Sequence, residues 1–284
     1  MTRAEVWTRA KTVATAVGWI VLFVVVGLVV SGVLLQLVGP RQGSRWWTAQ
    51  IGACSVAGFG LATWLIGRVA NKRSWADMGW GEPRQLLLRL ARGTAMGVVM
   101  AGIAVFLCLA AGARLERAST EGWLSAAAPL AVGFLLAALA EELWFRGYPL
   151  RCLADATSRW VATVLLAGAF AAAHLANPGA DALATVNLAL AGLWLSVAFF
   201  SRGAMPGAWG LHFGWNAGLA LGVGATVSGL EFDLPGPEYA AGPWWWIDGG
   251  DFGPEGGLVG TIVFVVGIAM LVRHKWRSPR EWLA

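Results

Sequence analysis

Long apolar runs, separated by short polar segments, set the pattern of this sequence. A helix needs about 20 apolar residues to cross a bilayer, and eight runs of that order contain no Asp, Glu, Lys or Arg. The runs are residues 12–40, 46–67, 93–113, 122–140, 160–180, 182–201, 203–230 and 256–272. They predict an all-α fold, a polytopic membrane bundle of about eight transmembrane helices.

The composition favours a surface that faces lipid. Charged residues make up 13% of the chain and hydrophobic residues 57%, whereas a soluble domain carries about a quarter charged residues. Three cysteines lie in or beside the apolar runs, which favours small buried side chains over disulfides or a thiolate metal site. The first run exceeds the roughly 7–15-residue apolar core of a signal peptide, so we expect a retained span.

Basic residues gather in alternate polar segments. Of the 21 Lys and Arg residues, 17 lie on one side if the spans alternate, in residues 1–11, 68–92, 146–159, 202 and 273–284. Cytoplasmic segments of membrane proteins carry such an excess, so both termini are predicted to be cytoplasmic. The net charge of +5 does not indicate a nucleic-acid partner, because the basic residues are spread in short groups between apolar runs.

Two polar segments differ from the others. Residues 231–255 hold six acidic residues, no basic one and the cluster Trp244–Trp246, which is typical of an anchor at the membrane–water boundary. Residues 68–92 mix basic and large apolar side chains, so part of this segment is predicted to lie on the inner membrane surface as an amphipathic helix that binds anionic lipid.

The chain therefore divides into three segments. Residues 1–120 hold the first three helices and the basic loop, and residues 121–230 hold the four helices of the functional core. Residues 231–284 hold the acidic, Trp-rich loop, the last helix and a basic tail.

Polar residues within the apolar runs are the candidates for function, because ionisable side chains are costly in a membrane. Glu141 and Glu142 end the fourth run, His174 lies in the fifth, and His212 and Asn216 lie in the seventh. Each alone has a structural alternative, such as an interhelical hydrogen bond. Together they place acid–base groups on three helices, which favours one shared site.

Helical spacing assigns these residues to faces. Glu142 and Arg146 are four positions apart and can pair on one face, whereas Glu141 is rotated by about 100° and is left free. His212 and Asn216 also share a face. Phe170 lies one turn before His174, where its ring can pack on the imidazole.

The chemistry of this set fits hydrolysis. A glutamate beside a histidine can take a proton from water and make a nucleophile, and a histidine with a nearby amide can stabilise the oxyanion that follows. Glu141, His174 and His212 also match a zinc hydrolase set of two histidines and a glutamate. The residues leave open a metal-free mechanism or a zinc-bound water, so no cofactor is assigned and zinc is a candidate.

These motifs resemble the CAAX-processing and bacteriocin-processing protease family, also called the Abi or type II CAAX prenyl endopeptidase family. The elements are Glu141-Glu142-Leu-Trp-Phe-Arg146, Phe170-Ala-Ala-Ala-His174 and His212-Phe-Gly-Trp-Asn216, in that order. The resemblance implies an intramembrane endopeptidase with Glu141 as the base and His174 as its partner. It further implies that His212 and Asn216 stabilise the oxyanion, and that Glu142 and Arg146 support the site.

Sequences around the core motifs resemble the bacterial branch of this family. They are Asn177-Pro178, Val227-Ser228-Gly229 and Phe252-Gly253-Pro254-Glu255. The resemblance implies an integral protein of a bacterial plasma membrane that acts on a peptide or protein substrate. The alternatives are a non-catalytic immunity or scaffold protein and, less favoured, a proton-coupled transporter, which would need ionisable residues along a path across the bilayer.

Spacing also sets a condition on the site. His174 lies 15 residues beyond Arg159, which is about 22 Å along a helix at 1.5 Å per residue. Glu141 can meet it only if it lies well below the inner surface. We therefore expect the fourth helix to continue through Arg146 to about Leu153, with the site in a polar cavity inside the membrane.

Overall fold

The computed structural model describes residues 2–39, 42–116, 119–201 and 203–275 and confirms an all-α bundle. The α-helices are α1 (Arg3–Val38), α2 (Trp47–Ala62), α3 (Leu86–Ala110), α4 (Trp123–Phe145), α5 (Tyr148–Ala156), α6 (Arg159–Ala173), α7 (Ala182–Phe199), α8 (Ala204–Val223), α9 (Trp245–Asp248) and α10 (Leu258–Lys275). A π-helical segment, η1 (Thr63–Ala70), extends α2, and short 3₁₀ turns lie at η2 (Pro83–Gln85) and η3 (Gly250–Phe252).

Each predicted apolar run contains a helix. Within the described residues, five helical stretches are long and apolar enough to cross a membrane: Ala4–Val38, Trp47–Ala70, Pro83–Ala110, Trp123–Ala156 and Ala182–Phe199. Helices α6 and α10 are also apolar but shorter. The chain is thus an integral membrane protein by length and composition of its helices, and the count of eight crossings stays a prediction.

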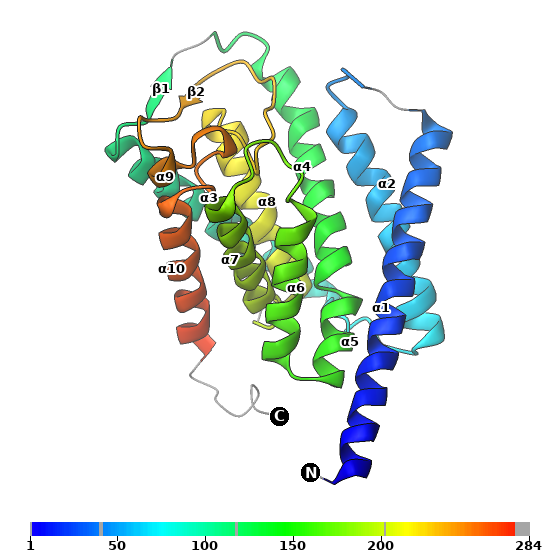
Figure 1. Ribbon diagram of the computed structural model, residues 1–284. Coiled ribbons are helices and arrows are strands. Elements are labelled where there is room, and N and C mark those ends of the chain that lie inside the picture. The colour runs from blue at the N-terminus through cyan, green and yellow to red at the C-terminus, as the bar shows by residue number, and fades with distance from the viewer. Residues whose placement is uncertain (1, 40–41, 117–118, 202, 276–284) are drawn as a thin grey trace.

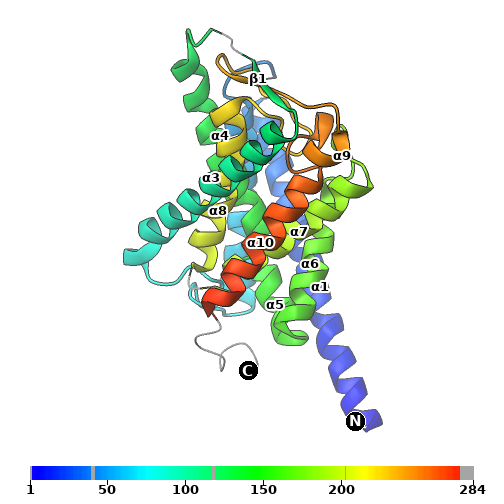
Figure 2. The ribbon, with the colours of Figure 1, turned by 90° about the vertical axis from the view of Figure 1, so that its left-hand side faces the viewer.

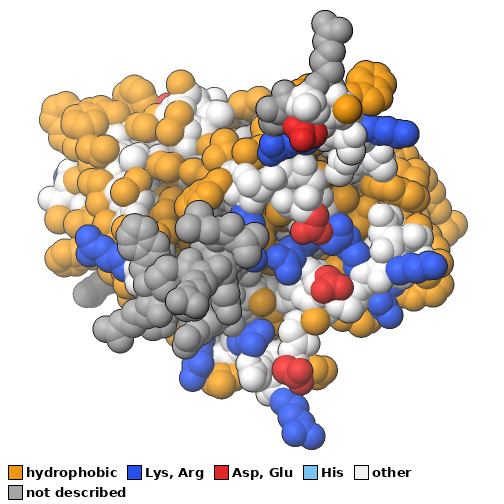
Figure 3. All heavy atoms as spheres, turned by 90° about the horizontal axis from the view of Figure 1, so that it is seen from below, with side chains coloured by type: hydrophobic (Ala, Val, Ile, Leu, Met, Phe, Trp, Pro, Cys, Tyr) orange, Lys and Arg blue, Asp and Glu red, His pale blue; other side chains and the backbone are white. Residues whose placement is uncertain are grey.

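The helices run roughly along one axis, with the start of α1 and the end of α10 at the same end of the bundle (Figure 1). Helices α1 and α2 form one side, and α3, α8 and α10 lie together on the other (Figures 1 and 2). Lys and Arg side chains stand among apolar ones on the end seen from below (Figure 3). That distribution fits the predicted cytoplasmic side, whose assignment stays a prediction. Among the basic residues on which this assignment rests, Arg41, Arg117, Arg202, Arg277 and Arg280 lie outside the described residues.

Glycines let α3 and α8 pack backbone to backbone. A Cβ added at Gly97 would lie 2.3 Å from the carbonyl oxygen of Leu211, and one at Gly214 would lie 2.2 Å from that of Thr94. Small residues permit such close approach at membrane helix interfaces. The packing holds α8, which carries His212 and Asn216, at a fixed depth against α3.

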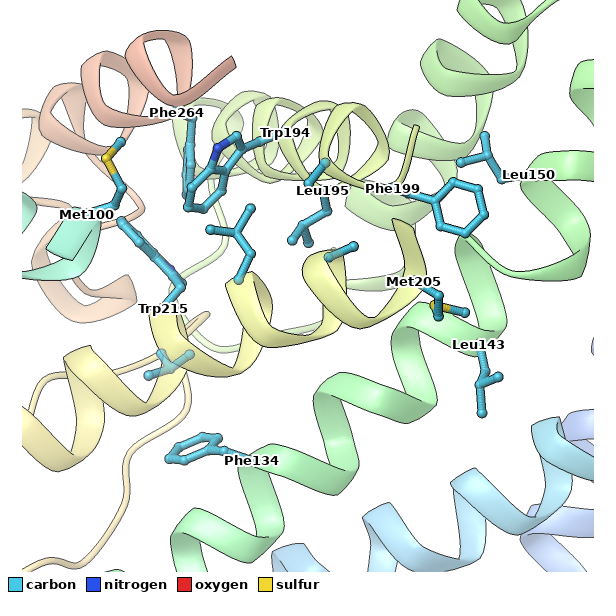
Figure 4. Close-up of a cluster of buried hydrophobic side chains, with 14 of the residues drawn as sticks. Met100, Phe134, Leu143, Leu150, Trp194, Leu195, Phe199, Met205, Trp215 and Phe264 are labelled. Atoms are coloured by element: carbon cyan, nitrogen blue, oxygen red, sulfur yellow. The ribbon is translucent and has the colours of Figure 1, made fainter. Parts of the chain in front are cut away.

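An aromatic cluster forms the core beside α8. Trp215 lies 4.9 Å from Phe264 of α10 and 5.9 Å from Trp194 of α7, between ring centroids. Figure 4 shows these rings meeting where the three helices converge. The cluster fixes the face of α8 that also carries the polar residues.

The predicted amphipathic helix in residues 68–92 does not form as a separate element. The structure has a non-helical stretch between η1 and η2, and η2 leads directly into α3. Two hydrogen bonds at 2.6 Å, from Arg73 to Asp155 and from Arg151 to the carbonyl of Asp77, fasten the loop to α5. Two apolar residues of the segment, Leu87 and Leu88, are exposed on the first turns of α3.

The expectation of one continuous helix through Arg146 is wrong. Helix α4 ends at Phe145, Gly147 has a non-helical ψ of −108°, and α5 begins at Tyr148. Pro149 explains the break, since it has no N–H to donate to the Phe145 carbonyl. Arg146, at this break, is nevertheless fully buried and paired with Glu142, as expected.

Opposite the termini, the described segments between α8 and α10 cover the end of the bundle (Figure 1). They include β2 (Glu238–Ala240), which pairs antiparallel with β1 (Arg114–Glu116) from the connection between α3 and α4. The apolar pattern did not predict this short ribbon. Trp244, Trp245 and Trp246 are exposed, as an aromatic anchor requires.

Candidate active site

A cavity of about 660 Å³ lies among α2, α4, α6, α7 and α8. Four predicted site residues line it: Glu141, His174, His212 and Asn216. Its walls are mostly aromatic and aliphatic, and its described lining contains no Lys or Arg. The cavity therefore brings acid–base side chains from three helices into an apolar setting.

Glu141 stands between the two histidines. Its Oε2 atom lies 3.7 Å from Nε2 of His212 and 4.0 Å from Nε2 of His174. These distances are too long for direct hydrogen bonds, and this oxygen has no hydrogen bond to any described residue. The predicted meeting of Glu141 and His174 is confirmed, because the two side chains lie well within the ~10 Å that it required.

His174 is held by the end of its own helix. It caps α6, and its Nδ1 lies 2.8 Å from the carbonyl oxygen of Phe170. A carbonyl only accepts hydrogen bonds, so Nδ1 carries the proton. The ring of Phe170 packs on the imidazole with centroids 4.6 Å apart, as the spacing predicted. The second ring nitrogen, Nε2, therefore faces Glu141.

His212 is held by the other glutamate. Its Nδ1 lies 3.0 Å from Oε1 of Glu142, and its side chain is buried. If Glu142 is ionised, its carboxylate only accepts, so Nδ1 of His212 is the donor and Nε2 again points to Glu141. The sequence assigned Glu142 to Arg146 alone and missed this contact, because residues on α4 and α8 have no fixed spacing.

Glu142 and Arg146 form the predicted pair, fully buried at 3.1 Å. Arg146 also donates to the carbonyl of Gly192 at 3.3 Å and lies over the ring of Phe170, 4.4 Å from its centroid. Desolvation makes a buried ion pair expensive to break from one side. Glu142 thus contacts His212, and Arg146 packs on Phe170, whose ring contacts His174.

Asn216 lines the cavity one helical turn after His212. Between them, Trp215 donates from Nε1 to a glutamate outside the predicted set, Glu255, at 2.7 Å. Another polar residue that the sequence reasoning passed over is Asn187 of α7, which is fully buried. An amide side chain in the middle of an apolar run was the signal that the sequence offered.

A zinc ion does not fit the arrangement of the described residues. They contain no group of three or more His, Cys, Asp or Glu side chains placed to hold a metal. The candidate set of Glu141, His174 and His212 is not such a group either, although the Nε2 atoms of both histidines face the Glu141 carboxylate.

A comparison with protein families matches the segment of the chain that carries these residues. The model of the family described as "Rce1-like: Type II CAAX prenyl endopeptidase Rce1-like" matches residues 123–218. The matched segment begins with α4 and contains all six predicted site residues. It confirms the resemblance that the motifs indicated. No curated protein and no solved structure was found to match the chain.

Proposed function

From the match of residues 123–218 to the Rce1-like type II CAAX prenyl endopeptidase family model, we propose that the protein hydrolyses a peptide bond in or near the membrane with water activated by Glu141 and His174. The observation that carries the proposal is the placement of Glu141 at 4.0 Å or less from the Nε2 atoms of His174 and His212, at the wall of a cavity. The family indicates the endopeptidase activity, and the mechanism is our own proposal.

Water activation follows from the protonation pattern. Two acceptor groups about 4 Å apart are too distant for direct contact and can share one water that donates to both. Glu141 takes a proton from a water that also contacts Nε2 of His174, and the resulting hydroxide attacks the peptide carbonyl. The proton is then available on Glu141 for the leaving amine.

Charge develops on the carbonyl oxygen during this attack. His212 with a proton on Nε2 and the amide of Asn216 are the donors that we assign to the oxyanion. Glu142 accepts from Nδ1 of His212, and this contact favours the protonated ring. Arg146 balances the charge of Glu142, so these two residues support the site without touching the substrate.

The cavity lining indicates the kind of substrate. Trp47 and Ile51 of α2, Phe134 of α4 and Phe170 of α6 are among the residues that line the cavity. Apolar walls with a few polar groups are typical of sites that bind apolar ligands. We propose a peptide segment that is apolar next to the scissile bond.

A reconstituted cleavage assay tests the proposal. The protein in liposomes is incubated with a library of membrane-inserted reporter peptides, and the products are identified by mass spectrometry. The wild-type protein is expected to cleave, and Glu141→Gln and His174→Ala are expected to abolish cleavage. A Glu141→Gln variant that folds and keeps the full biological effect would instead support an immunity or scaffold protein. Chelator treatment and metal analysis of the active protein test whether cleavage depends on a metal ion.

A further inference from the structure

Glu255 is a buried carboxylate that the mechanism above does not use. It is 4% exposed, precedes α10 and lines the same cavity as Glu141. It lies beyond the segment matched by the family. Among the described residues, no Lys, Arg or His forms an ion pair with it. A carboxylate in this setting must be held by neutral donors.

The first donor is on α8. Trp215 Nε1 donates to Oε2 of Glu255 at 2.7 Å. Trp215 directly precedes Asn216 and follows His212 by three positions. The bond therefore fixes the rotation of α8 at the point where both proposed oxyanion donors leave the helix.

The second donor, Ser228, connects Glu255 to the end of α6 through hydrogen bonds. The hydroxyl of Ser228 donates to Oε1 of Glu255, and the carbonyl of Ser228 accepts from the side chain of Asn177 at 2.8 Å. The backbone nitrogen of Asn177 in turn donates to the carbonyl of His174 at 3.0 Å. Ser228 has a φ of +49°, a strained conformation for a residue with a side chain that persists only when its surroundings hold it.

Glu255 is itself fixed through its backbone. The side chain of Asn187 donates to the carbonyls of Glu255 at 2.8 Å and Gly257 at 2.7 Å. Thr261 donates to the amide oxygen of Asn187 at 2.6 Å. The backbone of Glu255 is thus anchored to α7 and α10, while its carboxylate contacts α8 and the turn at Ser228.

We propose that Glu255 is a positioning residue that links the His174 end of α6 to the His212–Asn216 face of α8. The inference rests on the proposed peptidase function and adds to it a residue outside the motifs. The physical reason is that His174 and His212 come from helices joined only through long-range contacts, and a positional error of about 1 Å can cost a hundredfold in rate.

The test compares two replacements of the same side chain. Glu255→Leu removes both acceptors. Glu255→Gln keeps both links, because its amide oxygen accepts from Trp215 and its amide nitrogen donates to the Ser228 hydroxyl oxygen. Glu255→Leu is expected to lower kcat by about 10- to 100-fold with little change in KM, whereas Glu255→Gln keeps most of the activity. Asp251→Leu, the same change at an exposed position of the same loop, is the control.

Each other outcome contradicts the proposal. Equal losses in the Leu and Gln variants would indicate proton transfer by Glu255, and a rise in KM alone would indicate substrate contact. An unchanged kcat in Glu255→Leu would show that Glu255 does not position the catalytic residues. If Glu255→Leu does not fold, the Trp215→Phe and Ser228→Ala double variant decides, since it removes both donors and is expected to lower kcat in the same way.

A second measurement does not need activity. Carbethoxylation by diethylpyrocarbonate reports the access of each histidine, and the chain has three. Glu255→Leu, or the double variant in its place, is expected to change the labelling of His174 and His212 several-fold relative to His274. Unchanged labelling overturns the proposal even if the wild-type protein cleaves no reporter, an outcome that would separately refute the peptidase function.

Discussion

Two polar clusters line one cavity and are built in opposite ways. Around Glu141, the facing nitrogen and oxygen atoms are 3.7–4.0 Å apart and leave one carboxylate oxygen without a hydrogen bond to any described residue. Around Glu255, both carboxylate oxygens accept hydrogen bonds and the backbone is tied to Asn187. An unsatisfied buried polar atom is costly. The first cluster bears that cost at the place where we propose that the substrate reacts, and the second is the one to which we assign a positioning role.

The most direct test of this contrast is Glu141→Gln. We expect kcat for reporter cleavage to fall by about 10³-fold, because a general base contributes roughly 10²–10⁴. Thermal unfolding of the detergent-solubilised protein should change little, since this side chain is 31% exposed and its Oε2 has no hydrogen bond within the described residues. A large loss of stability would show that the cluster at Glu141 is structural.

Arg146→Met tests the buried Glu142–Arg146 ion pair, which supports the cluster around Glu141. Removing one partner of a buried ion pair is expected to destabilise the fold by about 3–5 kcal/mol, measured by denaturant unfolding in mixed micelles. Adding Glu142→Gln should recover part of this loss, because the uncompensated charge is then gone. No recovery in the double variant would contradict the assigned pairing.

Asn187→Leu tests the cluster around Glu255. It leaves the carbonyls of Glu255 and Gly257 without their shared donor, so we expect a loss of about 2 kcal/mol in unfolding free energy. Thr261→Val, which removes one neutral donor to the same amide, should cost about 1 kcal/mol. If Thr261→Val costs more than Asn187→Leu, the amide is not the anchor of Glu255.

A last pair of variants tests the packing of α3 against α8, away from both clusters. Gly214→Ala places a Cβ 2.2 Å from the carbonyl oxygen of Thr94, and overpacking of this kind typically costs about 1–3 kcal/mol. Gly222→Ala on the same helix meets nothing within 4 Å and should be neutral or slightly stabilising. Equal effects of the two changes on unfolding would show that α3 and α8 do not pack as closely as described.

Much of the site followed from local spacing. The pairs Glu142–Arg146 and Phe170–His174 are four positions apart on helices, and both contacts are present. The contact between His212 and Glu142 could not be predicted, because it depends on how α4 and α8 cross. The break at Gly147 was missed as well, although Pro149 was a visible signal.

By itself, the sequence determined an all-α membrane bundle and the residue types of the candidate site, because apolar run length and helical periodicity are local properties. Only the tertiary structure decided that Glu141 faces two Nε2 atoms, that Glu142 holds His212, and that Glu255 joins α6 to α8. These contacts join helices far apart in the chain. Their geometry is set by close packing at residues such as Gly97 and Gly214, which spacing along one helix does not encode.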